Sequence, residues 1–366
     1  MMIFAVNPAV AERTAPRAQR LAELVAEKEL DQLFVSDLVN VRYLTGFTGT
    51  NGACLVGREE LVFFTDFRYT ERAAAEVGPE WERPKAEREL IPQIVARMSG
   101  RVGFEDAKLS VRQLARLEAA ADEGVEFMSA GDLVEQLRAV KEPWELERIA
   151  AAAELTDGVY EWALEQGLVG RTEREVAQAC EARIRELGAE PSFPPIVASA
   201  GNGALPHAEP GDREIGSGEL VVFDMGSLLD GYCSDCTRTF ATGELDEESR
   251  EAYELVLRAQ LAALEAVRPA TSGKEVDAVA REMISEGGYG DHFGHGLGHG
   301  VGLEVHEAPR LSGTSEDDLV EGNVVTVEPG IYLPGKLGVR IEDLVTVTAD
   351  GYRNMSGLAK DLQIVN

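Results

Sequence analysis

Two strand-like segments joined by Asp230-Gly231 restrict the fold more than any other feature of the sequence. An Asp-Gly pair between two apolar runs is a strong signal for a two-residue β-hairpin turn. This turn would place Asp224 opposite Thr237, and Asp235 would point to the same face as Asp224 because side chains alternate along a strand. The run before Asp224 is apolar, which favours a buried face over two solvated acids. Buried carboxylates repel each other unless a cation lies between them, so the hairpin predicts a cation site.

A second acid pair, Glu328 and Glu342, belongs to another two strand-like runs. A two-residue turn at Pro334-Gly335 would put these carboxylates on opposite faces of the strands. A three-residue loop, or a bulge near Gly338, would bring them to one face. We therefore expect one of these two irregularities.

The histidines are concentrated in the C-terminal half of the chain. Four of the five lie between residues 292 and 306, in a segment where glycines recur at short intervals. Such glycines predict backbone that passes close to a bulky or charged group, although a loop that merely turns the chain is the simpler alternative. The spacing matches neither a dinucleotide fingerprint nor a zincin helix. The five are His207, His292, His295, His299 and His306.

Four carboxylates and one imidazole form a donor set suited to two divalent ions, with manganese the first expectation and cobalt or zinc as alternatives. Two such ions about 3.5–4 Å apart can share a hydroxide, which is a known aminopeptidase strategy. The set is a poor match for a single tetrahedral structural zinc. Its carboxylates are Asp224, Asp235, Glu328 and Glu342, and its imidazole is one of the clustered histidines.

The composition describes a globular, strongly acidic chain. With 366 residues, 44% of them hydrophobic, it has ample material for packed cores, and its net charge is −30. Such acidity makes nucleic acid a poor partner. Only seven of the 35 basic residues are lysine, and scattered acids with scarce lysine fit a halophilic surface adapted to a high-salt interior.

The chain carries no recognisable export or membrane signal. The first ten residues lack the basic stretch and long apolar core of a signal peptide, and no run of about 18 apolar residues occurs. We expect a soluble cytoplasmic protein with no membrane partner. The four cysteines are too few for a disulfide framework, so we expect reduced structural thiols, with a redox or zinc pair at Cys233 and Cys236 as the alternative.

Two domains are expected, residues 1–138 and residues 139–366. The first is predicted as a small α/β domain, and a boundary near Lys141-Glu142-Pro143 precedes clear helical periodicity. Its predicted helices are residues 15–28, 89–98 and 111–121, and its predicted strands are residues 32–35, 53–56 and 61–65.

In the second domain we expect a helix after Pro143 and another over residues 174–187. Thr172 and Glu175 have the spacing of a capping box for the latter helix. From residue 191 onward, strand-like runs surround one more long helix, residues 247–267.

These motifs together resemble the creatinase / aminopeptidase P / prolidase family, and most closely its prokaryotic Xaa-Pro dipeptidases. Residues 43–47 and 65–69 are similar to the family's non-catalytic N-terminal domain, and residues 141–145 are similar to the start of its catalytic domain. The resemblance implies an α/β (α+β) fold. In it a small N-terminal α/β domain precedes a pita-bread catalytic domain, whose curved antiparallel sheet is covered by helices.

The resemblance also implies roles for the metal-site residues. Asp235 and Glu342 would bridge two metals, Asp224 would hold one of them, and His299 and Glu328 would hold the other. Glu328 would also accept the proton of the attacking water, a hydroxide shared by the metals being the nucleophile.

Four further residues match family positions around the substrate. His207 would lie near the substrate, His306 would stabilise the developing oxyanion, and His295 would line the proline pocket. Arg340 would orient either the site or the substrate carboxylate. His292 has no counterpart and is expected to be structural.

The expected activity is hydrolysis of Xaa-Pro dipeptides, with a small peptide as partner and a homodimer as assembly. An aminopeptidase P-like enzyme acting on longer peptides is the main alternative, since it shares the metal motifs. A non-catalytic pita-bread binding module would have lost metal ligands. Creatinase is disfavoured by the intact ligand set, and methionine aminopeptidase by the extra N-terminal domain.

Overall fold

The computed structural model describes residues 8–85 and 88–366. The chain divides into two compact units, Met1–Arg138 and Ala139–Asn366. In the described ranges, no helix combines the length and apolar character needed to cross a membrane.

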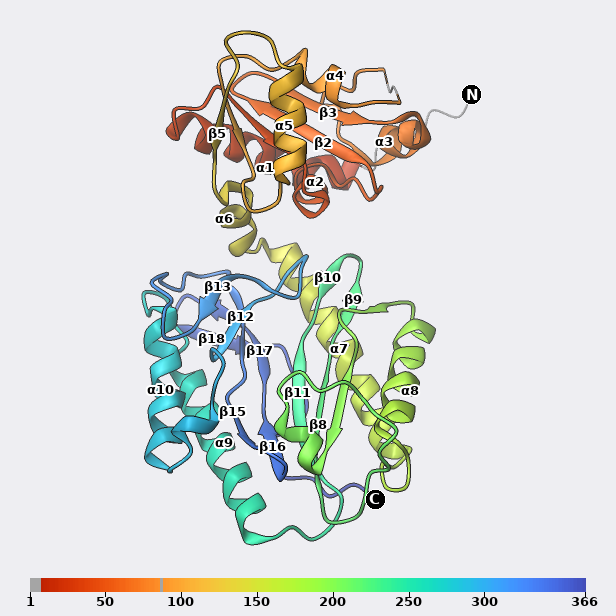
Figure 1. The fold of residues 1–366 in the computed structure, drawn as a ribbon, viewed down its shortest axis with the longest axis vertical. Helices are drawn as coiled ribbons and strands as arrows, with labels where there is room; N and C mark the ends of the chain where they lie inside the picture. The colour runs from red at the N-terminus through yellow and green to blue at the C-terminus, as the bar shows by residue number, and fades with distance from the viewer. Residues whose placement is uncertain (1–7, 86–87) are drawn as a thin grey trace. The chain divides into compact units, whose positions relative to one another are not determined.

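The N-terminal unit is built on a five-stranded mixed sheet in the order β3-β2-β1-β4-β5 (Figure 1). β1 pairs antiparallel with β2 and parallel with β4, and β4 pairs parallel with β5. The three predicted strands are confirmed, and two are added. The strands are β1 (Gln32–Val35), β2 (Gly52–Gly57), β3 (Leu61–Thr65), β4 (Arg101–Phe104) and β5 (Glu126–Ser129).

The three helices predicted in this unit are present as α1, α4 and α5 with shifted ends, and α2, α3 and α6 were not predicted. The first predicted helix begins earlier, and the second is cut to a single short segment that has Pro92 in its first turn. Asp66 and Arg68 form an ion pair at 2.8 Å beside a short 3₁₀ turn. The helices are α1 (Pro8–Glu27), α2 (Leu38–Thr45), α3 (Thr70–Glu76), α4 (Ile91–Val95), α5 (Val111–Ala120) and α6 (Leu133–Ala139).

A buried carboxylate lies at the carboxyl end of β4. Glu105 is only 3% exposed and accepts hydrogen bonds from the backbone N–H groups of Ser36 and Asp37 and from the Asn40 side chain. Burial, partly offset by these bonds, raises the pKa of Glu105 from 4.5 to about 7. The folded unit therefore holds this proton more tightly than the unfolded chain does.

This pKa shift predicts a pH-dependent loss of stability. An acid with a raised folded-state pKa contributes its stability below its unfolded pKa and loses it as the pH rises through the folded value. The free energy of unfolding should fall by about 3 kcal/mol between pH 4.5 and 7 on account of Glu105. Urea denaturation across this range should show a flatter pH profile for Glu105→Gln than for the wild type, and parallel profiles would contradict the assignment.

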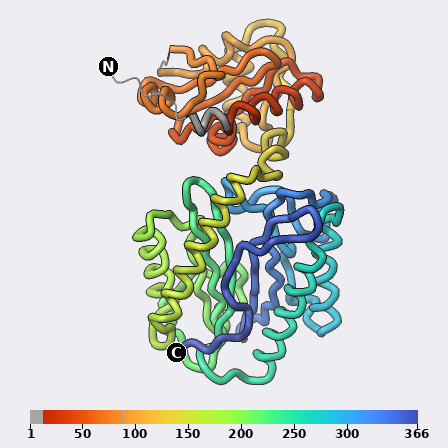
Figure 2. The backbone as a smooth tube through the Cα atoms, turned by 180° about the vertical axis from the view of Figure 1, so that it is seen from behind, coloured from red at the N-terminus to blue at the C-terminus, as the bar shows by residue number. Residues whose placement is uncertain are grey.

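Two pairs of helices flank the sheets of the C-terminal unit, as Figures 1 and 2 show. They are α7 (Pro143–Glu165) with α8 (Glu173–Glu186), and α9 (Glu247–Ala266) with α10 (Gly273–Glu286). The predicted capping box of α8 is confirmed, with Thr172 accepting from the Glu175 amide. The helix predicted over residues 247–267 is confirmed as α9, but it is not the last one, because α10 follows it with its own capping box at Ser272 and Glu275.

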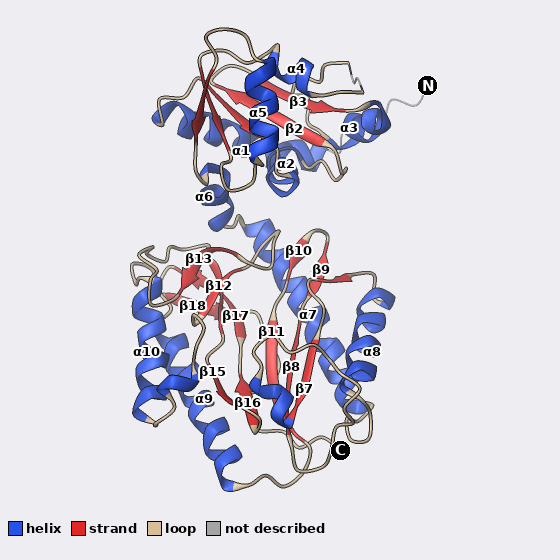
Figure 3. Cartoon of the chain, in the orientation of Figure 1, coloured by secondary structure: helices blue, strands red, loops and turns tan. Residues whose placement is uncertain are grey.

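The strands of this unit pair antiparallel throughout, which confirms the expected fold class (Figure 3). Apolar residues of α9 and α10 pack with those of the strands into one large core. The named strands are β6 (Glu190–Pro191), β7 (Ile196–Ser199), β8 (Leu220–Met225), β9 (Ser227–Leu229), β10 (Tyr232–Cys233), β11 (Cys236–Ala241), β12 (Gly298–Gly300), β13 (Glu307–Leu311), β14 (Val324–Val327), β15 (Gly330–Leu333), β16 (Leu337–Arg340), β17 (Asp343–Thr348) and β18 (Gly351–Asn354).

The first hairpin forms in the predicted register. Asp224 pairs with Thr237, and β9 returns into β10 through a two-residue turn. Asp230 and Gly231 take positive φ angles of 52° and 91°, as expected at both central positions of a type I′ turn. The observed register is thus the one from which side-chain alternation placed Asp224 and Asp235 on the same face.

The second hairpin uses a three-residue loop, the first of the two expected irregularities. Leu333 pairs with Leu337 at one end, and Val327 pairs with Asp343 at the other. Glu328 and Glu342 are the next residues toward the loop after the Val327–Asp343 pair, so they lie opposite each other in the hairpin. No bulge is needed at Gly338, whose missing side chain instead lets the backbone of Gly203 pack against it.

Candidate metal centre

Strand ends of the C-terminal unit carry all five predicted metal donors. Asp224 lies in β8 and Asp235 directly before β11, so both belong to the first hairpin. His299 lies in the short strand β12, while Glu328 follows β14 and Glu342 precedes β17. Three separate segments therefore contribute to one site.

The donors meet closely enough to share ions. In the described part of the chain, one ligand atom each from Asp235, His299 and Glu342 lie within 4.8 Å of one another. His299 Nε2 is 3.6 Å from Asp235 Oδ2 and 3.3 Å from Glu328 Oε1. Burial raises the pKa of both Asp235 and Glu342, and the nearby charge of Asp224 adds to this rise.

The cluster holds more negative charge than its burial tolerates. Burial, reinforced by the neighbouring carboxylates, raises the pKa of Asp235 and of Glu342 well above their usual values. Burial alone would raise the pKa of Glu328 too, but the hydrogen bond and charge of His299 outweigh it and lower this pKa to about 2. Cations between the carboxylates would relieve both the repulsion and the loss of hydration.

The free donor atoms fit divalent ions. Asp224 Oδ1 and Glu342 Oε1 are buried, and neither accepts a hydrogen bond from a described residue. A buried carboxylate oxygen without a partner is costly, whereas as a metal ligand it would be satisfied. Carboxylate oxygens with one imidazole suit hard to borderline ions, so the residues present fit the metals that the sequence predicts.

Neighbouring hydroxyl and carbonyl groups orient these donors. Thr237 donates to Glu342 Oε2 at 2.8 Å, and Thr326 donates to Glu328 Oε1 at 3.1 Å. His299 Nδ1 lies 3.1 Å from its neighbour's carbonyl oxygen at Gly300, which turns Nε2 toward the carboxylates. Such supporting bonds are typical around metal ligands.

Arg340 is bound inside the cluster. Its side chain is 4% exposed, and Nη2 donates to Asp224 Oδ2 at 2.6 Å. The other guanidinium nitrogens donate to Thr237 Oγ1 at 3.0 Å, to the Tyr332 hydroxyl at 2.9 Å and to the Pro206 carbonyl at 3.2 Å. Of the two expected roles for Arg340, the geometry favours orienting the site over binding the substrate carboxylate.

His295 belongs to the same hydrogen-bond network. Its Nδ1 lies 2.8 Å from the Gly296 carbonyl and its Nε2 lies 2.9 Å from the Tyr332 hydroxyl. Since Arg340 donates to that hydroxyl, the network assigns Nδ1 as the protonated nitrogen, with Tyr332 donating to Nε2. Burial lowers the pKa of His295, which favours the neutral ring and disfavours its use as a carboxylate-binding cation.

His306 and His207 lie at the exposed edge of the site. The His306 ring centroid is 4.3 Å from that of His299, in an edge-on arrangement. The residue after it, Glu307, accepts from the Glu304 amide at 2.9 Å and pairs with the buried Lys141 at 3.8 Å, which holds this loop in place. His207 is exposed, next to the Pro206 carbonyl that Arg340 contacts.

The remaining candidates take structural positions. His292 is half-buried with its ring 6.4 Å from that of Tyr289. Cys233 and Cys236 are buried free thiols, and burial raises the pKa of Cys236 well above its usual value. A raised thiol pKa disfavours the thiolate that redox or zinc chemistry requires.

Sequence reasoning missed the residues that support the donors. Tyr332 follows Glu328 by four residues and shares its strand face, so the same alternation could have found it. Arg238 is fully buried behind the cluster, paired with Asp343 at 2.8 Å and donating to the Glu342 carbonyl. No local motif pointed to Arg238, because its partners lie about one hundred residues away.

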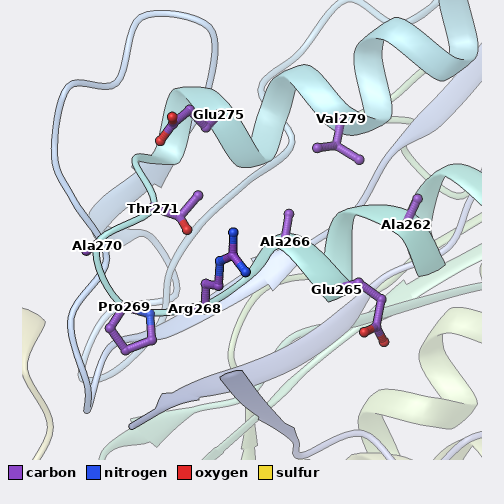
Figure 4. A pocket seen from close by; sticks show the side chains of 9 residues that line it. All are labelled: Ala262, Glu265, Ala266, Arg268, Pro269, Ala270, Thr271, Glu275 and Val279. Atoms are coloured by element: carbon purple, nitrogen blue, oxygen red, sulfur yellow. The ribbon is translucent and has the colours of Figure 1, made fainter. Parts of the chain in front are cut away.

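One surface groove lies apart from the metal centre. It has a volume of about 660 Å³ and is formed by α9, α10 and the turn between them (Figure 4). It contains none of the predicted metal donors or substrate residues. The side chains around it include Ala262, Glu265, Arg268, Thr271, Glu275 and Val279.

Comparison with known proteins identifies the family. Residues 147–349 match the model of metallopeptidase family M24, and residues 17–140 match that of the creatinase/prolidase N-terminal domain. The chain belongs to metallopeptidase family M24. It is thus an enzyme, and a metallopeptidase family implies divalent metal ions.

Several relatives are similar over nearly the whole length of this metallopeptidase. The Xaa-Pro dipeptidase of Pyrococcus furiosus is 38% identical, with 94% of this chain and 99% of that protein covered. The structure of an Xaa-Pro dipeptidase from Bacillus anthracis has a TM-score of 0.93 at 37% identity, covering 96% and 100% of the two chains. An X-Pro aminopeptidase from Thermotoga maritima has a TM-score of 0.86 at 34% identity, covering 95% and 100%.

Proposed function

We propose that this metallopeptidase hydrolyses the peptide bond preceding proline in Xaa-Pro dipeptides. The observation that carries the proposal is the buried group of carboxylates around His299, with two carboxylate oxygens that lack partners among the described residues. The substrate class comes from relatives named Xaa-Pro dipeptidase, which are similar over nearly the whole chain.

In this proposal two divalent ions, manganese first and cobalt or zinc next, are held by the five donors. Asp235 and Glu342 would bridge the ions, Asp224 would bind one, and His299 and Glu328 the other. The ions would supply Lewis-acid polarisation of the scissile carbonyl and a lowered pKa for the attacking water. All five donors belong to residues 139–366, so we propose this unit as the catalytic domain and residues 1–138 as a non-catalytic one.

Glu328 is the proposed general base. The Thr326 hydroxyl holds one of its oxygens at 3.1 Å, and its lowered pKa keeps it ionised and able to accept a proton at neutral pH. His306 would stabilise charge on the carbonyl oxygen from the open side of the site. His207 would contact the substrate, and His295 would line the proline pocket with Tyr332.

An Xaa-Pro aminopeptidase is the second candidate, because one similar structure is an X-Pro aminopeptidase. The two functions differ in what lies beyond proline. A dipeptidase must bind a free carboxylate there, whereas an aminopeptidase must accept a continuing chain.

Substrate length separates the two candidates. With manganese or cobalt added, Ala-Pro and Leu-Pro should be cleaved far faster than Ala-Pro amide or Leu-Pro-Gly. Loss of a carboxylate that pairs with a charged group should cost on the order of 10²-fold in kcat/KM, because the partner is left unpaired. Equal cleavage of the dipeptides and the longer peptides would favour the aminopeptidase instead.

His306 should act on the transition state without holding metal. His306→Ala is expected to retain wild-type metal content and to lose on the order of 10²-fold in kcat, as for a removed oxyanion donor. Metal analysis beside steady-state kinetics makes the measurement, and His292→Ala serves as the matched control outside the cluster. Loss of metal from His306→Ala would instead make His306 a ligand.

A further inference from the structure

The loop that carries His207 follows β7 and contains little regular structure. We call residues 200–211 the His207 loop. It begins with a short 3₁₀ turn, Ala200–Ala204, and contains the Pro206 carbonyl that Arg340 contacts. His207 itself is exposed, so its own packing does not fix its position.

The carboxylate of Glu173 binds both ends of this loop. Glu173 is the first residue of α8, which lies beside β7 (Figure 3), and it is fully buried. Oε1 accepts from the Ser199 amide at 2.8 Å and from its hydroxyl at 2.7 Å, just before the loop. Oε2 accepts from the Gly211 amide at 3.1 Å, where the loop ends, and the Asn202 side chain donates to both oxygens.

Burying a carboxylate is costly, so these donors need a reason to converge on it. Helix capping does not explain them, because Thr172 and Glu175 already form the capping box of α8. The five contacts instead go to residues at both ends of one loop and within it. Charge-assisted hydrogen bonds of this kind are about twice as strong as neutral ones and set positions accurately.

We propose that Glu173 is a positioning residue that fixes the His207 loop over the metal centre. From the opposite side, Arg340 donates to Pro206, and the backbone of Gly203 packs closely on Gly338 of β16. The loop is thereby fastened at its two ends by Glu173 and in its middle by the metal-site arginine. The consequence for catalysis rests on the proposed function, in which His207 contacts the substrate.

Glu173→Gln tests the clamp with almost no change of shape. An amide offers one acceptor oxygen, so its NH₂ group must face either the Ser199 donors or those of Gly211 and Asn202. At least one of the Ser199 and Gly211 amides should therefore exchange hydrogen faster than in the wild type. The kcat/KM should fall by on the order of 10²-fold with metal content unchanged, because small displacements of a substrate-contacting group are costly.

Glu175→Gln is the matched control, since Glu175 lies two residues further along α8, is exposed and retains its capping bond. Asn202→Ser is the second variant, which removes the donor from the loop side and leaves Glu173 intact. Unchanged exchange at Ser199 and Gly211 in Glu173→Gln would overturn the clamp. Faster exchange with unchanged kcat/KM would overturn its role in positioning. The exchange measurement needs no substrate, so it tests the clamp even if Xaa-Pro peptides prove not to be cleaved.

Discussion

Asp235→Ala is expected to remove both metal ions and to abolish peptidase activity. One ligand atom each from Asp235, His299 and Glu342 lie within 4.8 Å of one another. Because Asp235 would bridge the ions, its loss would weaken both sites at once, whereas loss of a terminal ligand such as Asp224 should spare one ion. Metal content of the purified variant and hydrolysis of Ala-Pro measure the two effects. Glu342→Ala should behave in the same way.

The control for this prediction is Asp230→Asn at the tip of the same hairpin. Asp230 has a positive φ that asparagine tolerates, and it lies outside the metal cluster. Full metal stoichiometry in Asp235→Ala would reject its bridging role. Loss of metal from Asp230→Asn would show that the hairpin, rather than the carboxylate, is at fault.

Arg340→Met is expected to weaken both the metal site and the fold. The substitution leaves the Asp224 carboxylate buried without the guanidinium that contacts it at 2.6 Å. Breaking a buried ion pair by removing one partner typically costs about 3–5 kcal/mol of stability. Loss of a residue that orients a ligand typically weakens metal affinity by roughly 10–100-fold. Urea denaturation and metal titration of the variant measure the two losses.

Arg340→Lys provides the intermediate case, and Arg268→Met provides the surface control. Lysine keeps the charge but cannot reach Asp224, Thr237 and Tyr332 together, so partial losses are expected. Arg268 is exposed in the groove between α9 and α10, and its substitution should change neither quantity. Wild-type metal affinity and stability in Arg340→Met would contradict the role of Arg340 in supporting Asp224 and the metal site.

Arg340→Lys also decides between the two roles expected for Arg340, orienting the metal site or binding the substrate carboxylate. If Arg340 only orients the site, Arg340→Lys should lose activity on Ala-Pro and on its amide in the same proportion. If Arg340 binds the substrate carboxylate, the preference for the free dipeptide should collapse in the variant. The contacts of Arg340 with Asp224 and Tyr332 lead us to expect the first result.

The sequence determined the local geometry on which the site depends. The Asp-Gly turn set the register that pairs Asp224 with Thr237, and strand alternation then placed Asp235. The capping box at Thr172 marked the start of α8 in the same way. These features follow from φ/ψ preferences and side-chain alternation over a few residues, so they can be predicted without knowledge of tertiary contacts. The capping box at Ser272 and Glu275 is an equally local signal for α10, which the sequence analysis did not predict.

Tertiary structure decided what lies against these elements. Strand alternation left open whether a loop or a bulge would align Glu328 with Glu342, and the pairing of β14 with β17 and of β15 with β16 selected the three-residue loop. Arg340 meets Asp224, and Glu173 meets Ser199 and Gly211, only because distant segments pack together. Local preferences fix the face on which a side chain lies, but long-range packing chooses the group that it faces there.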